Sequence, residues 1–150
     1  MTPITLAENV RAYLEEQRRD LRAHTPQLRI YGALDLALPS VKLPGLATVP
    51  LGEDTDPDLA PEGTETVQRV FTTIAVVAAI AAPNDPSGDR ARDPLDTLVK
   101  ATRELLAGWV PARRWDPLAL RRSRLLLLAD GRVAWQDEYT TYGWRVASRS

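Results

Sequence analysis

"TETVQRVFTTIAVVAAIAA" (residues 64–82) is a segment whose secondary structure determines what the rest of the chain can build around it. Several of its apolar residues would fit one face of a helix: Val67, Val70, Phe71, Ile74 and Val77. However, nine of the 14 residues at positions 64–77 are β-branched. Branching at Cβ restricts the χ1 torsion and favours the pleated surface of a sheet. We therefore predict one long strand over 64–82, with a start that projects beyond the sheet.

A hairpin is predicted in "LLLLADGRVAWQDEYTTYGWRV" (residues 125–146), because Asp130-Gly131 is a favoured two-residue turn. We expect one face of this hairpin, with Leu126, Leu128, Val133 and Trp135, to belong to the core. The turn sets a register in which the facing pairs are Ala129 with Arg132, Leu128 with Val133, Leu126 with Trp135 and Arg124 with Asp137.

A first helix is predicted at about 5–22. Thr5 and Glu8 have the spacing of a capping box, and Thr25-Pro26 ends the helical pattern. Glu15 and Arg19 are spaced as an i,i+4 ion pair on its outer side. Its apolar face would consist of Leu6, Val10, Tyr13, Leu14 and Leu21.

A second helix is predicted to begin with Asp93 as N-cap and Pro94 at the first helical position. Gly108 and Pro111 would end it. We expect its apolar stripe to pack on the hairpin face that carries Leu126 and Trp135. The stripe consists of Leu95, Leu98, Val99, Thr102, Leu105, Leu106 and Trp109.

The remaining segments complete the expected fold. We predict short strands at Leu28–Tyr31 and at Leu46–Leu51, the second ending at Gly52, and one or two helical turns over Gly32–Leu38. Glu53–Gly63 and 83–92 have the composition of loops. The expected fold class is α+β: a mostly antiparallel four- to five-stranded sheet with two main helices packed on one face, in a single domain over 1–150.

Composition excludes several classes of function. The chain has 150 residues, a formal net charge of −1, no cysteine and one histidine, His24. Disulfides, thiolate metal sites and a two-histidine metal site are therefore excluded within one chain. The balanced charge gives no reason to expect nucleic-acid binding through bulk electrostatics.

The N-terminal segment is unlike a secretory signal, and no apolar run reaches the ~20 residues of a membrane span. We expect a cytoplasmic setting without a membrane.

No set of residues converges as a catalytic site. Asp137 and Glu138 are adjacent in a predicted strand, so their side chains point to opposite faces and cannot flank one substrate bond. His24 follows a helix end, where interaction with the helix dipole is the usual role. The acidic cluster near Glu53 lacks the spacing of a calcium loop. We expect no enzyme activity, no cofactor and no metal.

The basic segment "ARRWDPLALRRSR" (residues 112–124) places arginines around Trp115. Arginine beside an aromatic residue can stack on nucleic-acid bases, but the same residues are enriched in protein interfaces. The near-zero net charge favours the interface interpretation.

The order of these segments resembles the lambda-like tail terminator proteins of long-tailed bacteriophages, over roughly 5–146. The order and spacing of three segments carry the resemblance: Pro50-Leu51-Gly52-Glu53 after a strand, the helix end Leu105-Leu106-Ala107-Gly108-Trp109, and the hairpin with Asp130-Gly131 and Trp135-Gln136-Asp137-Glu138-Tyr139.

The resemblance implies a structural virion protein that forms a hexameric ring at the head-proximal end of the tail. Such a ring caps the tail tube, ends its polymerisation and meets the head–tail connector on its other face; DNA passes through it without specific contacts, and assembly takes place in the bacterial cytoplasm. Another head–tail adaptor, a tail-tube subunit, and a small enzyme or effector-binding domain remain alternatives. A ring needs two different lateral edges. We expect them to include the polar and charged residues Glu65, Gln68, Arg69, Arg121, Arg122, Arg124, Asp137 and Glu138.

Overall fold

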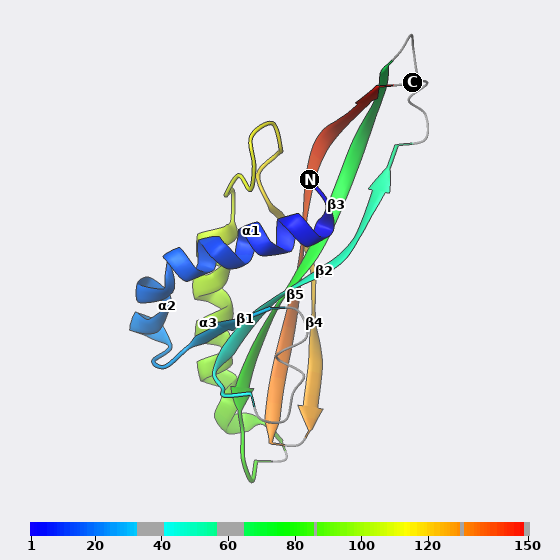
Figure 1. The fold of residues 1–150 in the computed structure, drawn as a ribbon. Helices are drawn as coiled ribbons and strands as arrows, with labels where there is room; N and C mark the ends of the chain where they lie inside the picture. Colours follow the sequence, from blue (N-terminus) through cyan, green and yellow to red (C-terminus); the bar gives the residue numbers. More distant parts are fainter. Residues whose placement is uncertain (33–40, 57–64, 86, 130, 149–150) are drawn as a thin grey trace.

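The fold is described from a computed structural model, which covers residues 1–32, 41–56, 65–85, 87–129 and 131–148 (Figure 1). Its centre is a mixed sheet in the order β1-β2-β3-β5-β4. β1 is parallel to β2, and every other pair is antiparallel. The α+β prediction is confirmed. The strands are β1 (Arg29–Tyr31), β2 (Gly45–Thr55), β3 (Glu65–Ala81), β4 (Ala119–Ala129) and β5 (Arg132–Ser148).

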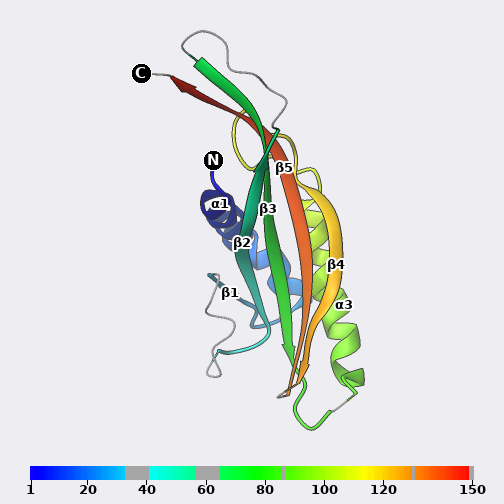
Figure 2. The same cartoon turned by 90° about the vertical axis from the view of Figure 1, so that its right-hand side faces the viewer.

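The helices lie on one side of the sheet, and the other side carries no helix in the part of the chain described (Figures 1 and 2). They are α1 (Pro3–Glu16), α2 (Arg18–His24) and α3 (Asp89–Leu106). α1 packs on β2 and β3, α3 packs on β3 and β5, and α2 contacts α3. The main core lies between helices and sheet, and its fully buried large side chains include Leu6, Leu14, Leu21, Leu46, Ile74, Leu98, Leu106 and Tyr139.

The long strand predicted over 64–82 is confirmed as β3, the central strand of the sheet. Its alternate residues Ile74, Val76 and Ala78 face the helices, whereas Val77 and Ala79 belong to a small second cluster with Ala134 on the opposite face. A strand that is covered on both faces explains the nearly continuous apolar run, because neither side of it is left to polar residues.

The single helix predicted over 5–22 is wrong in two respects. It begins earlier, because Thr2 accepts a hydrogen bond from the Thr5 backbone N–H at 3.2 Å and Pro3 occupies the first turn. It is also interrupted at Gln17, whose φ of −94° and ψ of 9° leave the helical region. Because of this break, α1 packs on β2 and β3 while α2 changes direction and contacts α3. Glu15 consequently pairs with Arg18 at 3.3 Å and not with Arg19.

The start predicted for the second helix is also wrong, because α3 begins at Asp89 within the predicted 83–92 loop. Gly88 adopts a positive φ of 74° before the helix, and the Asp85 carboxylate accepts a hydrogen bond from the Arg90 backbone N–H at 2.7 Å. Pro94 therefore lies inside α3, where it removes one backbone hydrogen bond. Burial of Ala91 in the core and the Asp85 contact stabilise the added turn.

β1 confirms the predicted strand at Leu28–Tyr31, but β2 continues past Gly52 to Thr55. The register with β3 shifts between Pro50 and Gly52, which indicates a β-bulge that lets the strand continue. Residues 53–55 are thus strand and not loop. The predicted turns over Gly32–Leu38 and most of the predicted Glu53–Gly63 loop fall at 33–40 and 57–64, outside the described residues.

The late hairpin forms, but the predicted register holds only next to its turn. Leu128 pairs with Val133 as predicted, whereas shifts between Leu125 and Leu127 and between Leu120 and Arg122 displace the rest of β4. Each bulge adds one residue to β4, so Leu125 lies opposite Trp135 in place of Leu126. Leu126 is 46% exposed and is not a core residue.

Candidate functional site

Asp137 lies on the helix-covered face of β5 and is held by two side chains. Arg103 of α3 donates to both of its carboxylate oxygens at 2.7 Å, and the Trp135 indole N–H donates at 2.9 Å. Burial opposes ionisation of this carboxyl, but the hydrogen bonds, chiefly from Arg103, hold its pKa below the usual range. The predicted pairing with Arg124 is wrong: the bulge places Ser123 opposite Asp137 and Arg124 opposite Gln136.

Glu138 points to the opposite face, as the alternation of side chains along a strand requires. The Arg122 guanidinium of β4 donates to it at 2.6 Å and lowers the pKa of its carboxyl. Arg122 remains 68% exposed although Glu138 is buried. The two acids therefore serve separate ion pairs on opposite faces, and they do not form a catalytic pair.

The other residues considered for chemistry also lie apart. His24 is the exposed last residue of α2. Glu53, from the acidic cluster, pairs with Arg145 of β5 at 2.9 Å. Across the described ranges there is no group of three histidine, cysteine or acidic residues that could hold a metal ion.

At the end of the sheet where β3 begins and β5 finishes, only these two strands remain paired. This end carries Gln68 and Arg69. β2 ends opposite Val70 and β4 begins opposite Thr140, so only β3 and β5 pair beyond those points. We call residues 65–69 and 144–148 the projecting ribbon; it extends beyond the helices in both views (Figures 1 and 2). Glu65 is its first residue, opposite Ser148, and its side chain is outside the described part.

The helix-covered side of the base of the ribbon is closed by the segment that connects α3 to β4. The Asp116 backbone N–H donates to the Tyr142 carbonyl at 2.9 Å, and the Thr141 hydroxyl donates to the Asp116 carbonyl at 2.6 Å. Trp115 lies directly over Gly143, where a Cβ would overlap the indole ring. Trp115 of the basic segment therefore packs against this chain's own β5.

β4 is the outer strand of the sheet, and its surface is both basic and apolar. Arg121, Arg122 and Arg124 are exposed. Leu120 and Leu125 are also exposed, at 42% and 52%. A long edge strand with apolar side chains is a surface that proteins normally cover or use for contacts.

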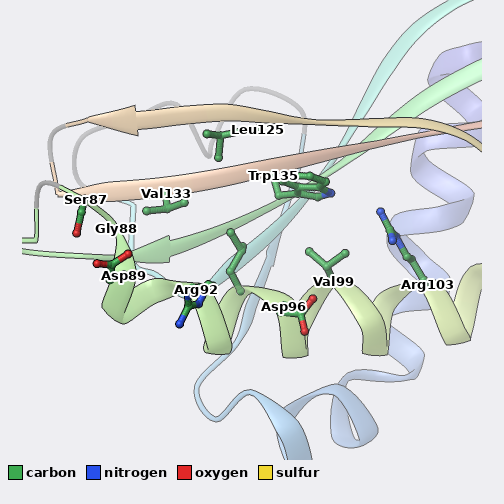
Figure 3. Close-up of a pocket in the computed structure, with 11 residues that line it drawn as sticks. Ser87, Gly88, Asp89, Arg92, Asp96, Val99, Arg103, Leu125, Val133 and Trp135 are labelled. Atoms are coloured by element: carbon green, nitrogen blue, oxygen red, sulfur yellow. The ribbon is translucent and has the colours of Figure 1, made fainter.

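A cavity of about 350 Å³ opens between α3 and the β4–β5 hairpin (Figure 3). Leu125 points into it from β4, and Val133 and Trp135 form its β5 wall (Figure 3). Arg92 and Asp96 line it from the side of α3. The charged side chains that line the cavity all come from α3, and among the residues described they do not converge as a catalytic group.

The structure thus distributes the predicted interface residues over two regions, the projecting ribbon and the β4–β5 edge. Three residues important to these regions were missed: Arg103, Trp144 and Arg145. Arg103 was not predicted because the pattern of α3 identified only its apolar, buried residues, and Arg103 lies beside that stripe. The alternation in "YGWRV" (residues 142–146) could have indicated Trp144, because it places Tyr142 and Trp144 on one face.

Comparison with known proteins identifies a family and solved structures of similar fold. Residues 8–145 match the family model described as phage tail terminator protein. No curated protein sequence matches the chain. A chain from the solved structure titled "Virion of native gene transfer agent (GTA) particle" has a similar fold, with a TM-score of 0.54 and 14% identity over 90% of this chain and 94% of that chain. None of the helices described here is long and apolar enough to cross a membrane.

Proposed function

Because this chain belongs to the phage tail terminator family, it is a structural protein of the phage tail, and we propose that it caps the tail tube as a ring of six copies. The ring ends polymerisation of the tube at the head-proximal end and offers its other face to the head–tail connector. Each chain acts as a single domain without a cofactor, and DNA passes through the ring without sequence-specific contacts. Assembly takes place in the host cytoplasm.

The observation that best supports a ring is the difference between the two edges of the sheet. β1 is a parallel strand of three residues, whereas β4 is an antiparallel strand of 11 residues with exposed arginines and leucines. A ring of more than two copies joins unlike surfaces of neighbouring subunits, because contacts between identical patches close as a dimer. Unlike edges on one chain meet that requirement.

We assign the lateral contacts to the polar and charged residues of the two regions. Arg121, Arg122 and Arg124 lie on the β4 edge, and Gln68 and Arg69 lie on the ribbon with Glu65. Asp137 and Glu138 contribute to the same regions indirectly, because each fixes an arginine, Arg103 and Arg122 respectively. Exposed charges favour the correct neighbour and set register more than they add affinity.

We also propose that the protein is not an enzyme. The acids that could serve as general acid and base are committed to ion pairs on opposite faces of β5. A structural role as a cap requires surfaces for the tube, the connector and two neighbours, and it requires no chemistry.

Deletion of the gene from its phage, with complementation from a plasmid, tests this function. Electron microscopy of the lysate should show tails of uncontrolled length without heads, and the plasmid copy should restore tails of one length joined to heads. Normal-length tails without heads would instead indicate an adaptor, and complete absence of tails would indicate a tube subunit. Either result would replace the proposed function.

A further inference from the structure

One face of the projecting ribbon is apolar although it is exposed. Trp144 is 56% exposed and Val67 is 40% exposed, and both lie on the face that carries no helix. Phe71 and Tyr142 continue this face towards the sheet, with their rings edge to face at 4.6 Å. A two-stranded ribbon is only marginally stable in water. An apolar face on such a ribbon is therefore a surface that a contact would stabilise.

Arg69 adds a positive charge to the same face. Its guanidinium lies 5.0 Å from the Tyr142 ring centroid and 5.7 Å from that of Phe71. Among the described residues, Arg69 forms no ion pair. The aromatic rings orient the cation on the ribbon face without neutralising it.

A surface with complementary properties lies at the other end of the same chain. The cavity between α3 and β4 has walls formed by Leu95, Val99, Leu125, Val133 and Trp135. Its rim carries charges of both signs, from Asp89, Arg92, Asp96 and Arg103. Three of them have partners within the chain, because Arg92 lies near Asp93, Asp96 pairs with Lys100 and Arg103 binds Asp137. Asp89, at the start of α3, forms no ion pair among the described residues. An aromatic side chain with a neighbouring cation matches an apolar cavity that has the Asp89 carboxylate at its rim.

One chain cannot join these two surfaces by itself. Trp144 lies opposite Arg69 of β3, and Trp135 of the cavity lies opposite Ala78, nine residues along the same strand. At ~3.3 Å per residue, the two places are separated by roughly 30 Å of rigid sheet. The contact therefore needs a second copy, and it joins two different surfaces.

We infer that the projecting ribbon of one copy docks on the next copy, with Trp144 in the cavity between α3 and β4 and Arg69 beside Asp89 at its rim. This inference rests on the proposed ring, because it names the contact between neighbours in that ring. Such a contact is head-to-tail, and it covers both the apolar face of the ribbon and the exposed Leu125. Trp144 would then supply much of the binding free energy, because a few buried aromatic or arginine residues usually dominate the affinity of an interface.

Cross-linking between singly labelled copies tests the contact. The chain has no cysteine, so Val67→Cys and Arg92→Cys variants each carry one thiol, on the ribbon and at the cavity, and both retain Trp144. Equal amounts of the two full-length variants are mixed, assembled in the presence of tail tubes and treated with a short bismaleimide. We expect a cross-linked dimer from the mixture. A matched mixture of Val67→Cys with Ile4→Cys should give little, because Ile4 is 72% exposed on α1, away from the cavity.

Trp144→Ala, introduced into the Val67→Cys chain, should reduce cross-linking to Arg92→Cys at least ~tenfold, as expected for an aromatic anchor. Val110→Ala, also at an exposed apolar residue, should leave it unchanged. Circular dichroism checks that both variants fold. Rings that form without the cross-link between positions 67 and 92 would overturn the docking contact alone. A chain that stays monomeric even on tail tubes would overturn the proposed ring and, with it, this contact.

Discussion

Arg103 of α3 binds both carboxylate oxygens of Asp137 in β5 at 2.7 Å, and this bidentate pair ties the helix to the sheet. The Asp137 side chain is 5% exposed and that of Arg103 is 37% exposed, so the acid is the buried partner. Ser123 of β4 accepts a further hydrogen bond from the same guanidinium at 2.8 Å. One arginine therefore joins α3, β4 and β5.

Arg103→Met should destabilise the protein more than Arg18→Met. The first variant leaves Asp137 buried without its charged partner, which costs about 1.5–3 kcal/mol for hydrogen bonds to a charged group. Arg18 pairs with Glu15 at the surface, with side chains 51% and 32% exposed, and loss of such a pair costs less than ~1 kcal/mol. Urea unfolding of both variants measures the difference; equal free energies of unfolding would show that the helix-to-sheet pair has no special role.

Stability should depend on pH through Asp137. Its pKa in the folded chain is lowered by hydrogen bonds that outweigh burial, so its contribution is present above the unfolded value of ~3.9 and is lost as pH falls through the folded pKa. The difference in unfolding free energy between wild type and Asp137→Asn should be largest near neutral pH and should shrink in acid below about pH 4. A difference that stays constant down to that range would contradict the assigned ionisation.

Gly143→Ala should displace Trp115, whereas Gly52→Ala should be tolerated. A Cβ at position 143 overlaps the indole ring, and a Cβ at position 52 meets no atom within 4 Å. Overpacking of this kind costs typically about 1–3 kcal/mol. Thermal unfolding and the tryptophan emission spectrum report both effects. If Gly143→Ala leaves stability and spectrum unchanged, the close packing of the α3–β4 connection on β5 is wrong.

Leu106→Ala should cost about 2–5 kcal/mol, because its side chain is fully buried beneath α3. Leu126→Ala is the matched control, since the β4 bulge leaves that leucine half exposed; its cost should stay within ~0.5 kcal/mol. A large effect at Leu126 would restore the unbulged register, in which this residue faces Trp135.

Arg124→Glu should impair assembly of the tail without unfolding the chain. Arg124 is exposed on the β4 edge, so reversal of its charge disturbs a lateral contact more than the core. Arg19→Glu provides a control at an exposed position on α2. Complementation counts tails joined to heads for each variant. Equal counts for the two variants would remove Arg124 from the proposed interface.

The architecture could be predicted from local physical chemistry. The β-branched residues indicated the central strand at 64–82, and apolar spacing located the buried face of α3 at Leu98 and Leu106. Helix starts were missed, because the decisive groups lie outside the expected helices: the Thr2 hydroxyl caps α1, and the Asp85 carboxylate holds the first turn of α3.

Register and pairing could not be predicted in the same way. One bulge of β4 lies at Arg121, between Leu120 and Arg122, and the other lies at Leu126. No glycine or proline in the sequence marks either position. The bulge at Leu126 shifts the facing pairs that follow it by one residue, and for this reason Asp137 faces Ser123 and not the predicted Arg124.

The candidate site was predicted only in part for the same reason. Charged residues such as Arg69 and Arg122 were found because charge is visible in the sequence. The exposure of Trp144 depends on where β2 and β4 end, and that is a property of the assembled sheet.

The most direct test of the proposed ring is electron cryomicroscopy of completed tails, with density averaged at the head-proximal end. We expect six copies of this chain in one closed ring on the last layer of the tube, joined through unlike surfaces of neighbouring copies. Density for the chain along the length of the tube, or a head-proximal end without it, would contradict the proposed role as the cap of the tail.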